Sequence, residues 1–512
     1  MKQQGRWAAS AAVFALVSAS GAAQVIGDAP LRHTAEFRAS TYAPSAQEAP
    51  AISVAPDGSF AVVWASRRQQ QGRYGVYMQR FERSGVAVGV ETPLNLWTRS
   101  HVMAPAIDFS ADSSAWAVWQ SSGQDGWGGA IIARRFDAHG AGGSEIPVNR
   151  HAEGEQYSPV VTALPDGGAV IAWTSAQPGR TEQVAIRVLN TDGSARTDEV
   201  TLDAGATLRT TTPSVAAAPD GSFAVAFASF DTESGLPAGV RVQTFSASGA
   251  PLAEPVRISR PGAETPVEPS IAATADGYVI AWHDVLENAL GYDVLASRLG
   301  RDGSPIGATT VVNTERAGLQ NAAAVAADSE GRITIAFNAL DEHDTGVFAR
   351  EFDRELRPVG GQYRLTGRVH GTQAMRAAAG TRRLAAAPDG TMLCAWKGDA
   401  GFGDSSSVNV TMHSPTPLEI GARTAGVTPA MEPSRLADDT AGGVVIASAD
   451  APEPHIPPTF DRRDIDATER EVLTTRSGVG FTGVVNTGWT PPDPHMAVGP
   501  DHIVAMTNGE IS

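Results

Sequence analysis

The chain has 512 residues, an apolar content of 42% and a formal net charge of −17. A chain of this length can fold as one large domain or as several. The acidic balance argues against a nucleic-acid-binding protein, which needs a basic face. A single cysteine, Cys394, excludes an intrachain disulfide framework.

The N-terminus has the pattern of a secretory signal. Lys2 and Arg6 precede a short apolar run at 8–18, and small residues follow it up to Ala23. The run is too short to span a membrane, and no other stretch approaches the about 18 apolar residues that a spanning helix needs. We expect residues 1–23 to be removed on export. The mature chain, without a membrane span, would then be secreted, periplasmic or held at the cell surface.

From residue 34 to residue 450, one pattern returns about every 55 residues. Its first copy, PAISVAPDGSFAVVW, begins at Pro50 and closes on Trp64. The later copies also close on aromatic residues, namely Trp119, Trp173, Phe227, Trp282, Phe337 and Trp396. A fixed period of this size indicates a repeat architecture.

Each copy contains two hairpin signals. In the first copy, a Pro-Asp-Gly turn at 56–58 joins two β-prone runs, and a Ser-Gly turn at 84–85 follows the alternating run 75–81. Four short antiparallel strands per unit predict an all-β fold, a β-propeller with seven blades. Radial stacking buries the sheet faces that a single blade leaves exposed.

Both ends of the repeat region bear on ring closure. Segment 35–41 resembles a fourth strand without its partners, and it would close the ring by completing the last blade. Segment 433–448 resembles the first two strands of a further unit, so eight blades is the alternative. Cys394 lies beside Trp396 in a strand pattern, which predicts a buried, unreactive thiol.

The remaining sequence differs in composition. Residues 451–477 are rich in proline and charge and are predicted to be a linker. Residues 478–512 begin a further β domain, with a hairpin predicted at 496–506. A lone hairpin is marginally stable, so we expect this domain to be truncated at residue 512.

The motif PDGSFAVVW at 56–64, followed by GVYMQRF at 75–81, resembles the tandem propeller-type repeats of large exported bacterial proteins. Segment 491–508 resembles the opening of a second β-rich domain of similar secreted proteins. These resemblances imply a repeat fold and export, and they assign no catalytic residue to this chain.

The sequence contains no nucleophile elbow, zinc-protease motif, P-loop or dinucleotide-binding motif. In the predicted blades the uniform Pro-Asp-Gly turns lie on one face, and loops of unequal length lie on the other. Binding residues concentrate on variable loops that a rigid scaffold holds. We therefore expect the functional face to be the variable-loop face.

Three groups of residues on that face are candidates for ligand binding. An aromatic ring beside a carboxylate is typical of sugar-binding surfaces, and histidine–carboxylate groups can transfer protons or hold a divalent cation. Solvated loop residues are the plain alternative. The candidates are Asp125 and Trp127, then His151 and Glu155, and finally His283, Asp284, Asp341, His343 and Asp344.

The leading hypothesis is an exported, non-catalytic binding or scaffold module that recognises a glycan, a cell-envelope component or a protein. It needs no cofactor beyond an optional divalent cation. One alternative is a propeller glycoside hydrolase or polysaccharide lyase, with carboxylates of different blades meeting at the channel mouth. Another is a spacer for a catalytic domain beyond residue 512. The ligand, the metal requirement and the oligomeric state stay open.

Overall fold

The computed structural model describes residues 33–414, apart from 203, 261–266, 287–290, 317, 341–344, 368–371, 376–380 and 399–406, together with three short strands near the C-terminus. The chain separates into two compact units, Met1–Gly426 and Val427–Ser512. The predicted signal segment 1–23, the predicted linker 451–477 and the segment 433–448 lie outside the described residues.

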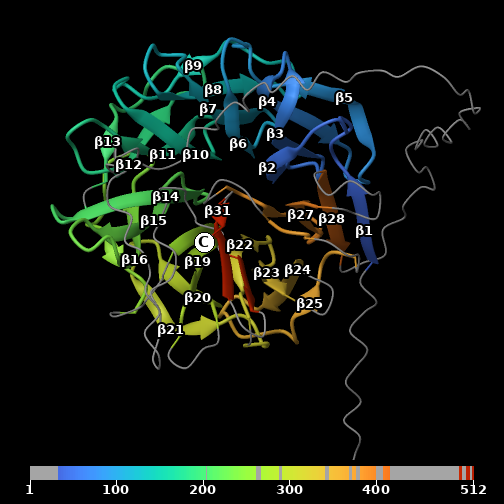
Figure 1. Ribbon diagram of the computed structural model, residues 1–512, viewed down its shortest axis with the longest axis vertical. Coiled ribbons are helices and arrows are strands. Elements are labelled where there is room, and N and C mark those ends of the chain that lie inside the picture. Colours follow the sequence, from blue (N-terminus) through green and yellow to red (C-terminus); the bar gives the residue numbers. More distant parts are fainter. Residues whose placement is uncertain are drawn as a thin grey trace, which may run out of the picture. The chain divides into compact units, whose positions relative to one another are not determined.

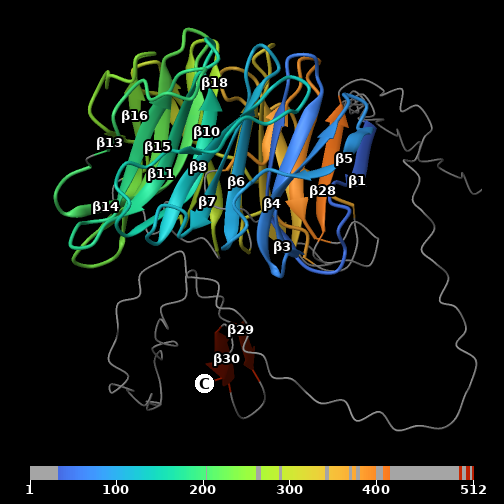
Figure 2. The same ribbon diagram turned by 90° about the horizontal axis from the view of Figure 1, so that it is seen from above.

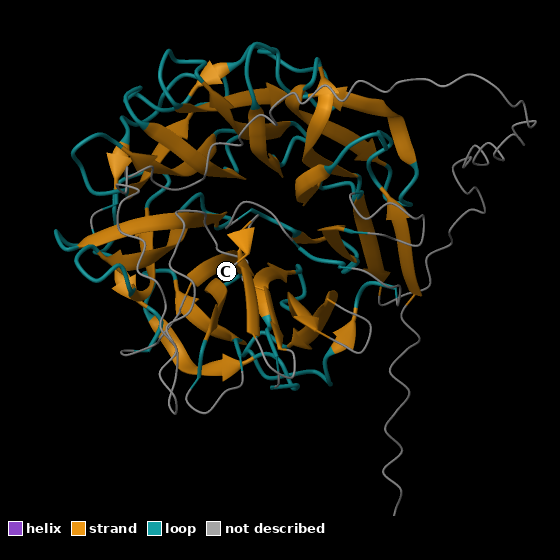
Figure 3. Ribbon diagram, viewed as in Figure 1, coloured by secondary structure: helices purple, strands orange, loops and turns teal. Residues whose placement is uncertain are grey.

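Seven four-stranded antiparallel sheets surround a central axis in the first unit, which confirms the seven-bladed propeller (Figure 1). The eight-bladed alternative is not realised. The described part of the chain consists of strands and loops and contains no helix (Figure 3). Seen from the side, the strands of each blade run between two faces that carry the connecting loops (Figure 2).

The strands of each blade follow one another outward from the axis. The innermost strands are β2 (Gln47–Val54), β6 (Val102–Phe109), β10 (Glu155–Ala163), β14 (Leu208–Ala217), β18 (Val267–Thr274), β22 (Asn321–Ala327) and β26 (Leu384–Ala386). The second strands are β3 (Phe60–Gln70), β7 (Ala115–Ser122), β11 (Ala169–Ala176), β15 (Phe223–Asp231), β19 (Gly277–Asp284), β23 (Ile333–Leu340) and β27 (Met392–Lys397).

The outer half of each blade is less uniform. The third strands are β4 (Arg73–Phe81), β8 (Gly129–Phe136), β12 (Gln183–Leu189), β16 (Pro237–Phe245), β20 (Asp293–Gly300), β24 (Thr345–Phe352) and β28 (Val408–Ser414). The outermost strands are β5 (Ala87–Pro93), β9 (Ile146–Pro147), β13 (Val200–Thr201), β17 (Val256–Arg257), β21 (Pro305–Val311), β25 (Tyr363–Arg364) and β1 (His33–Arg38).

The N-terminal strand closes the ring, as segment 35–41 led us to expect. β1 pairs antiparallel with β28, from His33 opposite Ser414 to Arg38 opposite Asn409. Blade seven therefore combines one strand from the start of the repeat region with three strands from its end. Because the first and last strands of the repeat region, β1 and β28, pair in one sheet, the ring cannot open without breaking that sheet.

Seven apolar clusters fill the seven gaps between neighbouring blades. The closing aromatics of the repeats are at most 1% exposed and belong to these clusters. Trp119, for example, packs with Met78 of blade one and Ile132 of its own blade. Burial of large aromatic and aliphatic side chains of this kind stabilises the packing between neighbouring blades.

The Pro-Asp-Gly turns are explained by turn chemistry alone. In the first turn Gly58 has a φ of +86°, and the main-chain NH of Ser59 donates to Asp57 Oδ1 at 2.9 Å. Hydrogen bonds from Ser59 lower the pKa of Asp57 below its ordinary value. These recurring aspartates cap turns on the face that we call the tight-turn face.

A recurring arginine contact links neighbouring blades. Arg134, Arg187 and Arg350 occupy the same place in their third strands. Each donates from Nη1 to a main-chain carbonyl of the preceding blade, at 2.7, 2.7 and 2.9 Å. Cys394 is 1% exposed, and burial raises the pKa of its thiol to about 12. The predicted burial of this thiol is thus confirmed.

In the second unit, β29 (His495–Val498), β30 (Ile503–Thr507) and β31 (Glu510–Ile511) form an antiparallel sheet. None of the described residues of either unit forms a helix long and apolar enough to cross a membrane.

Candidate functional site

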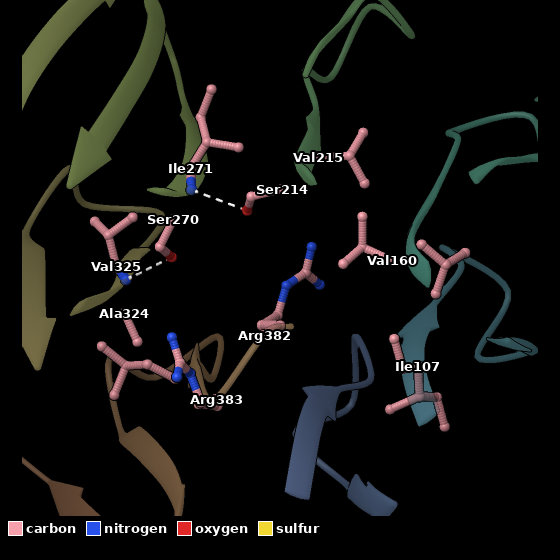
Figure 4. Close-up of a pocket in the computed structure, with 13 residues that line it drawn as sticks. Ile107, Val160, Ser214, Val215, Ser270, Ile271, Ala324, Val325, Arg382 and Arg383 are labelled. Atoms are coloured by element: carbon pink, nitrogen blue, oxygen red, sulfur yellow. Dashed lines mark hydrogen bonds between the residues drawn. The ribbon is translucent and has the colours of Figure 1, made fainter. Parts of the chain in front are cut away.

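The central channel of the propeller is closed. Its wall is formed by apolar residues of the innermost strands, among them Ile107, Val160, Val215, Ile271 and Val325 (Figure 4). The free volume is about 10 Å³, which is room for a single water molecule. A sugar cannot enter the channel, so a ligand has to bind at its mouth or on a face.

Two arginines of blade seven obstruct the channel, and Figure 4 shows the Arg382 side chain extending into it. Arg383 is 2% exposed and donates to the main-chain oxygens of Met375 at 2.8 Å and Ala323 at 3.0 Å. The other blades have a proline or an alanine at the place of Arg382, namely Pro50, Pro105, Pro159, Pro213, Pro269 and Ala323.

Arg382 pairs with Asp108 of blade two. The Asp108 carboxylate also accepts from Ser53 Oγ of blade one at 2.8 Å and from the main-chain NH of Ala163 of blade three at 2.9 Å. Four blades therefore meet at one carboxylate that is 7% exposed.

Because removal of Arg382 leaves the Asp108 charge without its ionic partner, we expect Arg382→Ala to lower the free energy of unfolding by about 2 kcal/mol. The matched control is Arg83→Ala, which breaks an ion pair with Asp389 in which the arginine is 55% exposed. That control should change stability by less than about 0.5 kcal/mol. Urea denaturation of both variants measures the difference, and equal effects would contradict the expectation.

A β-bulge recurs at the start of the innermost strands. In six blades the pairing with the second strand shifts there, and one residue has a positive φ near +50°. The residues at this place are Ala49, Ala104, Ser158, Thr212, Glu268 and Ala322. Five are small, and Glu268 of blade five is the one that carries a charge. Bulges of this kind re-aim side chains, and strained backbone positions cluster at functional sites.

The bulge places Glu268 beside a buried histidine at the channel mouth. Glu268 Oε2 lies 3.9 Å from Nδ1 of His283, and their side chains are 39% and 8% exposed. His283 Nδ1 has no hydrogen-bond partner among the described residues. The ring of Tyr292 meets the imidazole edge-on at 5.2 Å. Glu268 is thus the group of this cluster that solvent reaches best.

The electrostatics of the cluster favour a neutral imidazole. Burial lowers the pKa of His283 below its ordinary value, with the Arg383 charge adding to the effect and Glu268 and Asp284 opposing it. Burial also lowers the pKa of Arg383, and the charge of Glu268 opposes that shift. Glu268 therefore lies within electrostatic reach of both basic groups. We call Glu268, His283, Tyr292 and Arg383 the blade-five cluster.

The lowered pKa of His283 predicts acid-sensitive stability. In the unfolded chain its pKa is near the ordinary 6.5, so below that pH the unfolded state binds a proton that the folded state rejects. This destabilises the fold by at most about 1.4 kcal/mol per pH unit. The asparagine variant His283→Asn should flatten the loss of stability between about pH 7 and about pH 5.

Urea denaturation across this range measures the pH dependence. The matched control is His139→Asn, which removes an exposed histidine from a tight turn and should leave the wild-type slope. If the free energy of unfolding depends on pH equally in both variants and in the wild type, the prediction that His283 is buried in its neutral form is refuted.

Asp284 and Asp293 lie opposite each other in the β19–β20 pair and are both 0% exposed. Asp293 accepts from Asn313 Nδ2 and Arg316 Nη2, each at 2.7 Å. Asp284 also has an interaction partner. Both carboxylates are closed off from solvent in this arrangement.

A recurring cap explains Asp293 and also the predicted residue Asp125. Asn95, Asn149 and Asn313 follow the outermost strands, and each Oδ1 accepts from the main-chain NH of a third strand. Asp125 orients Asn149 by accepting from its Nδ2 at 3.0 Å, as Asp293 does for Asn313. The sequence pattern of Asp125 thus has a structural reason.

The other predicted residues of blades two and three make local contacts. His151 Nδ1 lies 3.0 Å from Glu199 Oε1. Glu199 also accepts a hydrogen bond from the main-chain NH of Arg150 at 2.7 Å. These contacts join blade three to the link that follows blade two. Exposed Glu155 accepts from the main-chain NH of Gly129 at 2.8 Å. Trp127 is 56% exposed, which suits an aromatic platform.

Of the predicted residues, the structure brings His283 and Asp284 together in blade five and distributes Asp125, Trp127, His151 and Glu155 over blades two and three. Asp341, His343 and Asp344 lie outside the described residues. In the part of the chain that the structure describes, no three His, Cys, Asp or Glu side chains are grouped to hold a metal ion.

Sequence reasoning missed Glu268, Arg382 and Arg383. Alignment of the repeats with one another carries a signal for all three. Glu268 stands where the other copies have alanine, serine or threonine, and Arg382 stands where most have proline.

No family model and no curated protein matches the chain. Among solved structures, it resembles an α-L-arabinanase from Penicillium chrysogenum, solved with arabinobiose, at 13% identity and a TM-score of 0.42, over 75% of this chain and 98% of the other. It also resembles an ulvan lyase solved with its glycan, at 9% identity and a TM-score of 0.47, over 74% and 95%. An α-L-arabinofuranosidase of Fusarium graminearum is 10% identical with a TM-score of 0.42, over 60% and 92%.

These solved propellers are glycoside hydrolases and polysaccharide lyases. The comparison contradicts the leading prediction of a non-catalytic binding or scaffold module, and it agrees with the predicted enzyme alternative. All of these matches have TM-scores below 0.5 and identities of 13% or less, so they do not establish the activity of this chain. The activity therefore has to be argued from the residues of this chain.

Proposed function

We propose that this chain is an exported glycan-active enzyme, a glycoside hydrolase or a polysaccharide lyase, in which Glu268 transfers the proton. The observation that carries the proposal is the position of Glu268. It is the charged residue at a strained bulge where the other described blades have small residues, and it lies 3.9 Å from a buried histidine.

Each member of the blade-five cluster has a role that its surroundings support. Glu268 is exposed enough to touch a substrate, and a carboxylate can act as a general acid or base. His283 is a positioning residue behind it. Contacts of this type are often long without substrate and shorten when it binds. Buried Arg383 lies within electrostatic reach of Glu268.

The substrate class follows from the shape of the mouth. The channel is closed below it, so a bound molecule has to extend across the variable-loop face. Exposed Trp127 and partly exposed Trp97 lie on this face, and aromatic rings with a polar edge suit the flat, partly apolar faces of sugars. An extended chain of sugars fits this arrangement better than a compact small molecule.

The two reaction types use the same proton-transfer group differently. In hydrolysis a carboxylic acid protonates the glycosidic oxygen, the bond to the anomeric carbon breaks, and water adds there with help from a second carboxylate. In elimination a base takes the proton next to a uronate carboxyl group, the electron pair forms a carbon–carbon double bond, and the glycosidic oxygen leaves with a proton. Within the blade-five cluster, Glu268 is the carboxylate with access to solvent.

The test is depolymerisation by the purified chain of a panel of neutral and acidic polysaccharides, with products read by mass spectrometry. Hydrolysis gives products heavier by one water, and elimination gives unsaturated ends without it. We expect one of the two product types from at least one glycan. If no glycan in the panel is cleaved, the proposal fails.

A further inference from the structure

Blade one carries a group of arginines on the variable-loop face that the blade-five cluster does not use. Arg68 and Arg73 flank the connection between β3 and β4, and Arg99 lies in the link to blade two. We call these three residues the arginine patch. We infer that the arginine patch is a binding site for the carboxylate or sulfate groups of an acidic polysaccharide.

The loops that carry the patch are held in place. Asn95 Nδ2 donates to Gln70 Oε1 at 3.0 Å and to the Trp97 carbonyl at 2.6 Å, which ties the two loops together. The main-chain NH of Tyr74 donates to His101 Nδ1 at 3.3 Å. The patch is therefore presented on a fixed surface, so less conformational freedom is lost when a ligand binds.

The backbone of Arg68 also indicates that the loop holds a defined conformation. Its φ is +64°, in the left-handed region that a non-glycine residue rarely adopts. The guanidinium of Arg99 lies 5.4 Å from the centre of the Trp97 ring, a cation–π contact that orients it. The strained backbone and the aromatic support both hold arginines at the surface.

Carboxylates of the described residues leave the charges of the patch unpaired. Several other arginines on the variable-loop face have carboxylate partners, as in the pairs Arg150–Asp198, Arg209–Glu182 and Arg316–Asp293. Among the described residues, no carboxylate forms an ion pair with an arginine of the patch. The nearby carboxylate of Glu48 is engaged by Lys397 at 3.3 Å.

The positive charges near the patch affect the pKa values of two neighbouring residues, His101 and Tyr74. The pKa of His101 is lowered, first by burial and then by the charge of Arg73. The pKa of Tyr74 is raised to about 12 by burial and by Glu48, while Arg67 and Arg68 act in the opposite direction. In a chain with a net charge of −17, this local excess of positive charge is not a general property of the surface.

The chemistry of the patch selects its partner. Guanidinium groups bind planar carboxylates and sulfates with two parallel hydrogen bonds. The overall negative charge repels nucleic acid at longer range. The specificity for anions follows from the arginines of the patch. The choice of a polysaccharide over an acidic protein rests on the proposed function, because the arginine patch and the blade-five cluster share one face.

The experiment measures binding by calorimetry, with polygalacturonate, dextran sulfate, neutral dextran and double-stranded DNA as probes. The double variant Arg68→Glu/Arg99→Glu should weaken binding of one or both acidic polysaccharides by about tenfold. The matched control is Arg180→Glu, which reverses an exposed arginine on the same face of blade three and should leave binding unchanged. Thermal unfolding verifies that all variants fold.

The outcomes separate the two acidic groups and the two proposals. Binding of polygalacturonate alone assigns the patch to carboxylates, and binding of dextran sulfate alone assigns it to sulfates. Equal loss in the Arg180→Glu control, equal binding of neutral dextran or equal binding of DNA overturns the inference. Loss of polysaccharide binding without any depolymerisation by the wild-type chain supports the patch and refutes the enzyme. If the double variant still depolymerises the glycan and binds it as the wild-type chain does, the result supports the enzyme and refutes the patch.

Discussion

Replacing Glu268 with glutamine should reduce the rate of glycan cleavage by a factor of about 10² to 10⁴. The amide keeps the size and the hydrogen-bonding reach of the side chain but cannot accept or deliver a proton at the reaction pH. The surrounding cluster keeps its packing, so we expect substrate binding to change much less than turnover. Initial rates on the best substrate of the panel give kcat and KM separately.

The control for this variant is Glu233→Gln, which removes an exposed carboxylate from a loop of blade four on the same face. It should retain wild-type kcat. A Glu268→Gln variant with wild-type turnover would remove Glu268 from the mechanism. A rise in KM with constant kcat would show that Glu268 binds substrate without transferring a proton.

Removal of strand β1, residues 33–38, should abolish the cooperative unfolding of the propeller. Blade seven would lose its outermost strand, and β28 would lose a partner along six residues. Phe37, whose ring centre lies 5.3 Å from that of Phe81 of blade one, would also be lost from the cluster between blades seven and one. A loss of this extent is comparable to the whole stability of a typical domain, about 5–15 kcal/mol.

A chain that begins at residue 40 tests this expectation by urea denaturation, and a chain that begins at residue 30 and keeps β1 is the control. A synthetic peptide of residues 31–42, added in excess, should restore the transition because it can take the place of the strand. The same peptide with Phe37→Asp should fail to do so. Two-state unfolding of the shorter chain with wild-type stability would show that the strand does not hold the ring together.

The fold could be predicted from the sequence because the repeats show the same local chemistry many times. The turn at 56–58 places glycine where φ is positive and aspartate where it caps the next NH, and each copy closes on a buried aromatic. Segment 35–41 could be recognised as a closing strand because it matches a fourth strand that has no preceding partners. Repetition made each of these weak local signals reliable.

The candidate site could be predicted only in part, because its geometry depends on long-range placement. His283 is recognisable as a polar residue at a strand end, and alignment of the repeats marks Glu268 as unusual. Only the folded structure shows that the bulge brings Glu268 close to that histidine. Asp125 and His151, predicted as ligand residues, also contact Asn149 and Glu199 in the structure. Polar residues that hold loops and polar residues that bind ligands have the same sequence signature.

The same reasoning explains why the functional prediction was wrong. The sequence lacks a linear catalytic motif, and the prediction of a non-catalytic module depends on that lack. The proposed proton-transfer site has no linear motif, because Glu268, His283 and Arg383 come from three separate strands or loops and meet only in the folded ring.

The most direct test of the account is a crystal structure of the Glu268→Gln variant with an oligosaccharide of a glycan that the wild-type chain cleaves. The account predicts an oligosaccharide that crosses the channel mouth on the variable-loop face. Its scissile bond should lie within hydrogen-bond reach, about 2.6–3.2 Å, of the residue 268 side chain. An oligosaccharide bound on the tight-turn face, or on blades remote from blade five, would contradict it.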